Sequence, residues 1–225
     1  TIAHYRAELA DEQFNQIMEG TFGKLGIKIL GWGETIHVGG FINTKKETAH
    51  IEDLKGLKLG VMRPGPADDI ALYAGMKGIY VPYAETMSAI ATGMIEVISQ
   101  SCSGAYATGQ YLDIKNGLWY PVPFALMMLM NLDKWNSLDA EFQDIITNTV
   151  MPEFEAYCIQ ASLEGETTAL TAMNESMDSC HFESPQTMYD LHLKLKAEYS
   201  TTKSMMAQYD PTLLSIIEAH RPATL

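Results

Sequence analysis

Hydrophobic positions near the start of the chain recur every three or four residues and then close up into short runs. In "ADEQFNQIMEGTFGKLG" (10–26) this spacing predicts a helix, and the glycines at its end are typical stop signals. The apolar runs "IKILGWG" (27–33) and "IHVGGFIN" (36–43) predict two separate extended segments. A glycine pair in the second run indicates a bulge or the close approach of another backbone.

Between residues 57 and 100 the pattern alternates between short apolar runs and amphipathic stretches. The expected elements are, in order, a strand at 57–62, a helix at 67–78, a strand at 79–83, a helix at 84–94 and a strand at 95–100. Asp68 and Asp69 fall in the first turn of the first helix, where carboxylates suit the helix dipole. This order is typical of a parallel α/β unit, and "SCSG" (101–104) is expected to turn the chain at its end.

The remainder of the chain has a different pattern. "WYPVPFALMMLMN" (119–131) predicts an extended, buried segment, whereas apolar residues at helical spacing predict a mainly helical stretch from Leu138 to about Glu175. Pro152 is expected to kink or divide that helix, because proline lacks a backbone donor and crowds the preceding turn. Two further helices are expected at 185–206 and 210–220.

Composition narrows the class of protein. The 225 residues are 47% hydrophobic and 19% charged, which is the balance of a globular protein of one domain or two small ones. The formal net charge of −13 repels phosphate backbones, so we expect no nucleic-acid partner. The longest apolar run, at 122–130, is too short to span a bilayer, so the chain is not expected to cross a membrane itself.

Residues suited to catalysis or metal binding show no organised spacing. Six histidines are scattered along the chain, and three cysteines form neither a CxxC pair nor a disulfide framework. We therefore expect no metal site, no cofactor and no catalytic residues. The glycines of "GWGETIHVGG" (31–40) do not follow the order of a nucleotide-binding loop. Cys102 has no histidine nearby in sequence, so packing is a simpler interpretation than nucleophilic catalysis.

Three aromatic residues are the more informative candidates. Trp32, Trp119 and Tyr120 all lie at or near the ends of expected strands, where open α/β sheets place their ligands. Burial in the core is the alternative interpretation of each.

Several motifs together resemble one family. These are "ILGWGETIHVGGFINTKKETAHIEDLKGLKLGV" (29–61), "VPYAETMSAIATGMIEV" (81–97) and "NLDKWNSLDAEFQDII" (131–146). In that order they are similar to segments of the solute-binding proteins of TRAP transporters, the DctP-type family. The resemblance extends from about residue 12 to residue 175 and, less specifically, to the last residue of the sequence.

The resemblance implies an α/β fold with a periplasmic-binding-protein-like (type II) two-lobe architecture and a long kinked helix. The N-terminal portion of the family has no counterpart in this sequence. On this basis, residues 1–56 would form an N-terminal helix and hinge-region strands, and 57–130 an α/β lobe. Residues 131–225 would then form the long hinge helix and the C-terminal helices.

The resemblance also implies a function. Such proteins are non-enzymatic receptors of the periplasm that capture a small organic acid in a cleft between the lobes and deliver it to the TRAP membrane permease. An enzyme or an effector-sensing lobe on the same fold is the alternative, since one fold hosts several functions.

The sequence departs from the family at two positions. Gly60 stands where the family places an arginine that forks onto the ligand carboxylate, and glycine cannot make that pair. Gln100 stands where the family has a ligand-facing asparagine. Arg63, three residues further on, is either a replacement anion clamp or a solvated loop charge. The residues expected to line the ligand site are Arg63, Gln100, Trp32, Tyr120 and Ser99.

Overall fold

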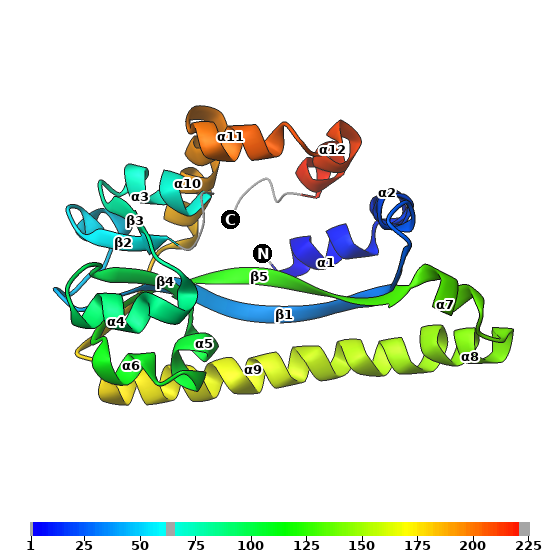
Figure 1. Cartoon of the computed structure of the whole chain (residues 1–225), viewed down its shortest axis with the longest axis horizontal. Coiled ribbons are helices and arrows are strands. Elements are labelled where there is room, and N and C mark those ends of the chain that lie inside the picture. Colours follow the sequence, from blue (N-terminus) through cyan, green and yellow to red (C-terminus); the bar gives the residue numbers. More distant parts are fainter. Residues whose placement is uncertain (1, 62–65, 221–225) are drawn as a thin grey trace. The chain divides into compact units, whose positions relative to one another are not determined.

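The chain folds into two compact units, and each unit is built from segments that are separate in the sequence. The structure, a computed structural model, describes residues 2–61 and 66–220 (Figure 1). The first unit is built from residues up to 36, from 123–164 and from 209 onward. The second comprises His37–Val122 and Gly165–Gln208. Three long elements, β1, β5 and α9, contribute residues to both units.

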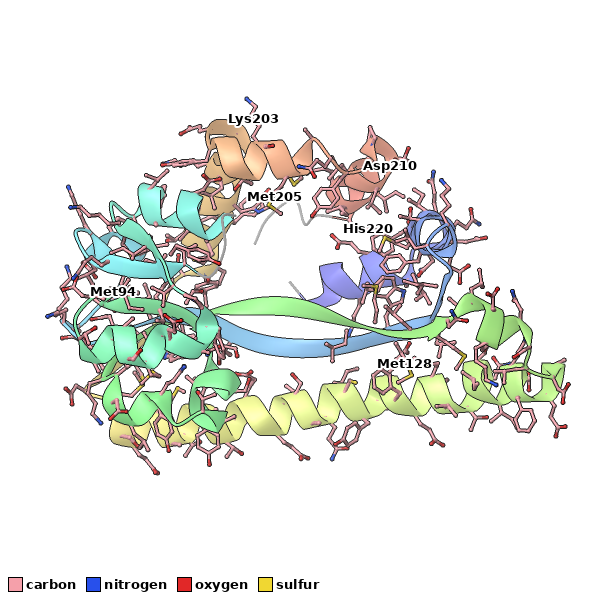
Figure 2. All side chains as sticks on the ribbon, in the orientation of Figure 1. Met94, Met128, Lys203, Met205, Asp210 and His220 are labelled. Atoms are coloured by element: carbon pink, nitrogen blue, oxygen red, sulfur yellow. The ribbon has the colours of Figure 1, made fainter. Side chains whose placement is uncertain are left out.

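The first unit is mainly helical. Its elements are α1 (Ile2–Ala10), α2 (Glu12–Gly23), the first part of β1 (Ile27–Asn43), the last part of β5 (Asn116–Asn131), α7 (Leu132–Asn136), α8 (Ala140–Ile145), a π-helical turn (Ile146–Val150), the start of α9 (Met151–Ser176) and α12 (Pro211–Ala219). Asp11 caps α2 by accepting from Phe14 N at 2.8 Å, and His220 Nε2 lies 3.0 Å from its other oxygen. Figure 2 shows His220 on the side of α12 that faces α2. These contacts hold the C-terminal helix against α2.

Pro152 does not divide the long helix. Helical structure continues from Ala140 to Ser176 and includes a π-helical turn at Ile146–Val150, just before the proline. The wider turn lies where the proline ring would otherwise crowd the backbone of a regular α-helix. The expected break is therefore replaced by a local change of helix type.

The second unit is built on a mixed six-stranded sheet in the order β3-β2-β4-β1-β5-β6. Besides β1 and β5, its elements are η1 (Ile51–Leu54), β2 (Lys58–Val61), α3 (Pro66–Tyr73), β3 (Lys77–Tyr80), η2 (Tyr83–Glu85), α4 (Thr86–Ala91), β4 (Val97–Ser101), α5 (Cys102–Ala107), α6 (Gln110–Asp113), the rest of α9, β6 (Ser179–Phe182), α10 (Pro185–Glu198) and α11 (Ser200–Met206). β2 pairs in parallel with both β3 and β4. The predicted strand–helix alternation between 57 and 100 is confirmed.

Two hydrophobic clusters cover the two faces of this sheet. On β4, Ile98 belongs to the cluster that contains residues of α4, α5 and α9, whereas Val97 belongs to the cluster with residues of α3 and α10. Successive residues of a strand point to opposite faces, so β4 divides its apolar residues between the two clusters. Figure 1 shows α4, α5 and α6 on one side of the strands and α3 and α10 on the other.

Asp69 was expected to interact only with the helix dipole, but it also binds a second helix. Its carboxylate is 1% exposed and accepts from both the backbone nitrogen and the hydroxyl of Thr202, at 2.6 and 2.8 Å. Thr202 lies in the first turn of α11, where helix donors lack partners within the helix. The aspartate thus joins α3 to α11.

The two extended segments expected at 27–33 and 36–43 form a single strand, β1. The glycine pair at 39–40 marks the close approach of another backbone, one of the two alternatives expected for it. A Cβ atom at Gly40 would lie 2.3 Å from the carbonyl oxygen of Leu118 on β5. β1 ends at Asn43, whose buried side chain accepts from the backbone nitrogens of Lys45 and Lys46 and so closes the following turn.

Two further expectations are corrected. "SCSG" does not form a turn: Ser101 caps α5 by accepting from Gly104 N at 3.1 Å, and Cys102 begins that helix. The segment 119–131 is extended as expected, but among its described side chains only that of Trp119 is buried. Trp119 is fully buried, whereas three later apolar residues of β5 are exposed, namely Leu126, Met127 and Leu129. Among the described helices, none has the length and apolar character needed to cross a bilayer.

Candidate ligand-binding site

The carboxyl ends of β2, β3 and β4 meet at one edge of the sheet, because these three strands are parallel. Open α/β sheets bind their ligands outside such an edge. The segment that follows β3 turns into η2, and β4 runs directly into α5. Arg63 follows β2 and lies outside the described residues, so its two interpretations stay open.

Gln100, near the end of β4, is held by three hydrogen bonds. Its amide nitrogen donates to the hydroxyl of Tyr83 at 3.2 Å and to Oε1 of Gln110 at 3.1 Å. Its own Oε1 accepts from the backbone nitrogen of Ser101 at 3.0 Å. A Cβ at Gly104 would come within 2.8 Å of this oxygen, so the glycine leaves room for the amide. The result is an ordered polar cluster at the edge of the sheet.

Tyr83 is the member of this cluster that sequence analysis missed. It is 50% exposed and lies at the start of η2, seventeen positions before Gln100. The sequence "VPYAE" signals only the end of a strand. A polar aromatic residue just beyond a parallel strand is the signal that could have identified it.

Ser99 and Tyr120 belong to the opposite face of the sheet from Gln100. Ser99 pairs with Phe41 across β4 and β1, and the ring of Phe41 lies 6.0 Å from that of Tyr120 on β5. Directly paired residues of antiparallel strands share a face, whereas Gln100, one residue on, points the other way. Ser99 is exposed, and Tyr120 is partly buried. Burial raises the pKa of Tyr120 to about 12, so its hydroxyl stays protonated near neutral pH.

Gly60 lies on β2 beside Ile98 of β4, on the same face as Gln100. A Cβ at this position would lie 2.6 Å from the terminal methyl of Ile95, which is fully buried. The isoleucine therefore fills the space that the first atoms of a longer side chain would need. Restoring an arginine here would require Ile95 to move.

Trp32 is in the first unit and is fixed by its own neighbours. Its indole nitrogen donates to Oδ1 of Asn15 at 2.7 Å, and its ring lies 5.7 Å from that of Phe14. It lines an open pocket of about 410 Å³ together with residues of α1 and α9, namely Arg6, Leu9, Ala10, Glu155 and Ile159. An aromatic wall beside groups of both charges can hold a small polar solute.

Within the described residues, no three His, Cys, Asp or Glu side chains are grouped so that they could hold a metal ion. Cys102 is fully buried, with its sulfur 3.3 Å from that of Met173. Burial, with a smaller contribution from Glu166, raises its pKa to about 12. A thiol that stays protonated is a poor nucleophile, which agrees with the packing interpretation.

Solved structures identify the class of protein to which this fold belongs. The chain is similar to a TRAP periplasmic solute-binding protein from Roseobacter denitrificans with bound β-D-glucuronate, at 17% identity and a TM-score of 0.74, covering 96% of this chain and 70% of that one. It is also similar to one from Shewanella oneidensis with bound succinate, at 17% identity and a TM-score of 0.74, covering 98% and 71%. The fold is that of a two-lobe α/β solute-binding protein.

The family follows from the sequence. The profile of bacterial extracellular solute-binding protein family 7 (DctP) matches residues 1–201, and the chain belongs to this family. A curated relative, a monocarboxylate 2-oxoacid-binding periplasmic protein of Nostoc, is 32% identical over 164 residues, which cover 67% of this chain. The match spans 39% of that relative's length. The predicted family and fold are thus confirmed.

Proposed function

We propose that this protein is an extracytoplasmic receptor that binds a small organic acid and presents it to the membrane permease of a TRAP-type transporter. Its place of action is the periplasm, and it binds its solute without changing it. Membership of the family of extracellular solute-binding proteins is the observation that carries the proposal.

The chemistry of the similar proteins supports the ligand class. The ligands that these proteins hold or are named for include glucuronate, succinate and 2-oxoacids, all of which carry a carboxylate. The edge formed by β2, β3 and β4 offers the hydroxyl of Tyr83, which is suited to such oxygens, and Trp32 lines an aromatic pocket in the first unit. Shape and a few well-placed polar groups are sufficient for binding of this kind.

We propose that the five residues expected from the sequence belong to the ligand site. Gln100 and Ser99 lie near the carboxyl end of β4 on opposite faces of the sheet, and Tyr120 lies in β5 on the face of Ser99. Trp32 lines its pocket, and Arg63 follows β2. An arginine would pair with a carboxylate in two parallel hydrogen bonds, which makes Arg63 the strongest single candidate for an anion contact. Gly60 leaves the family's usual arginine position without a charge.

The test is direct binding of defined acids. Purified protein is titrated with succinate, D-glucuronate and pyruvate in a calorimeter, and its thermal midpoint is followed with each acid at millimolar concentration. At least one acid should give saturable heat and raise the midpoint, because a ligand that binds only the folded state stabilises it. No heat and no shift with any of the three acids would contradict the proposal. Consumption of a bound acid, followed by NMR, would favour an enzyme instead.

A further inference from the structure

The amide of Gln100 has no donor left for a solute carboxylate. Its oxygen faces the backbone nitrogen of Ser101, which can only donate, so this contact fixes which end of the amide is the oxygen. The nitrogen then points at Tyr83 and Gln110, and its two hydrogens are used by these two contacts. Gln110 is 4% exposed, which anchors the far side of the cluster. The donors of Gln100 therefore act on neighbouring residues, and its remaining acceptor site cannot bind a carboxylate oxygen.

The orientation of Gln100 determines the role of the Tyr83 hydroxyl. An amide nitrogen can only donate, so the oxygen of Tyr83 accepts from it. The phenolic proton of Tyr83 then points elsewhere, and among the described residues no acceptor for it is found. The side chain is half exposed at the ligand-binding edge of the sheet. A hydroxyl held in this way presents a donor to whatever lies outside the edge.

We propose that Tyr83 binds the solute by donating its hydroxyl proton to an acceptor oxygen, such as one oxygen of a carboxylate. Gln100 is a positioning residue that fixes the direction of this donor and acts only through Tyr83. The inference rests on the proposed function, since it names the group that contacts the acid in that site. Gln100 stands where the family has a ligand-facing asparagine, so in this chain the residue at that position has a different role.

The first test removes only the hydroxyl. Tyr83→Phe keeps the ring and deletes the donor, and its affinity for succinate, D-glucuronate and pyruvate is measured by calorimetry beside that of the unchanged protein. A lost hydrogen bond to a charged oxygen should weaken binding by roughly ten- to a hundredfold. Tyr157→Phe, at a tyrosine of α9 that is 69% exposed, is the matched control and should bind as the unchanged protein does.

The second test asks whether Gln100 acts through Tyr83. Gln100→Met keeps the length of the side chain and removes the amide, so it should weaken binding in the unchanged protein but hardly at all when Tyr83→Phe is already present. Such non-additivity is the signature of coupled residues, and a purely structural role would give additive losses. The thermal midpoint of each variant without acid separates loss of fold from loss of binding.

The outcomes distinguish the two proposals. If the unchanged protein binds none of the three acids, both the function and this inference fail. If it binds an acid and Tyr83→Phe binds that acid equally well, the function stands and the role of Tyr83 is wrong. If Tyr83→Phe weakens binding while Gln100→Met adds its full loss on top, Tyr83 stays a contact and the positioning role of Gln100 is wrong.

Discussion

Glu183 shows how a single buried charge can join distant segments. Its carboxylate is 2% exposed, and its oxygens accept from Ile51 N and Ser184 N, both at 2.8 Å. His50 Nδ1 lies 3.4 Å away. Desolvation by itself raises the pKa of this group, but the hydrogen bonds together outweigh it and hold the pKa below its ordinary value of 4.5. The residue fastens η1 to the start of α10.

A pH dependence of stability follows at this residue. Because the folded-state pKa of Glu183 is lowered, its stabilisation is complete above the ordinary value of 4.5 and is lost as the pH falls through the lower, folded-state pKa. Glu183→Gln should cost about 1–3 kcal/mol at pH 7 and flatten the loss of stability below pH 4.5. Urea denaturation at pH 7 and at acidic pH measures both effects.

The control for this change is Glu198→Gln, at an exposed acid of the same helix, α10. It should leave the stability at pH 7 nearly unchanged, because exposed charges contribute little. Equal stability of Glu183→Gln and the unchanged protein at pH 7 would show that the buried carboxylate is not a structural contact.

At the scale of elements, β1 and β5 depend on the absence of a side chain at Gly40. A Cβ there would meet the backbone of Leu118 at 2.3 Å and the ring of Trp119 at 2.6 Å, and the backbone has little room to yield. Gly40→Ala should therefore destabilise the fold by about 1–3 kcal/mol or more, as overpacking does. Thermal or urea denaturation provides the measurement.

Gly165 offers a matched comparison for this substitution. It lies in α9 with no atom within 4 Å of an added Cβ, so Gly165→Ala should stabilise the fold by about 0.5–1 kcal/mol because alanine favours helix. The two alanine variants should thus move the denaturation midpoint in opposite directions. A neutral Gly40→Ala would mean that the two strands do not approach this closely.

The sequence predicted those elements whose signals are local. The alternation from 57 to 100 was readable because each strand and helix carries its own hydrophobic period. The continuity of β1 was not readable, since Gly31 and Gly33 look like the end of a strand, although the later glycine pair did indicate the close approach of another backbone. Likewise, Ser101 was taken for part of a turn because a helix cap is recognised only from the helix that follows.

The candidate site was less predictable than the fold, because it depends on contacts between residues far apart in sequence. Gln100 was identified from its position in a family motif, but its partners Tyr83 and Gln110 carry no motif that links them to it. Strand register decides that Ser99 and Gln100 face opposite sides, although they are neighbours in sequence. The sequence alone predicted the strand, but it did not show which of its residues face each side of the sheet.

For the whole molecule, the net charge bears on how the proposed solute, a small organic acid, would be captured. The chain carries 28 acidic and 15 basic residues, which gives a formal net charge of −13. A carboxylate solute is repelled by this field at long range, so its binding depends on contacts made after it arrives. Salt weakens such repulsion, because the screening length falls from about 30 Å at 0.01 M to about 8 Å at 0.15 M ionic strength.

The association rate of succinate or D-glucuronate should therefore rise with ionic strength, by up to about tenfold between 0.01 and 0.15 M salt. Stopped-flow fluorescence measures this rate, and the thermal midpoint at each salt concentration excludes a change in folding as the cause. A rate that falls with salt would reveal a positive local potential at the site that outweighs the net charge. In that case a basic residue such as Arg63 would have to attract the acid, and after its replacement with glutamine the rate should rise with salt, because only the repulsion by the net charge would remain.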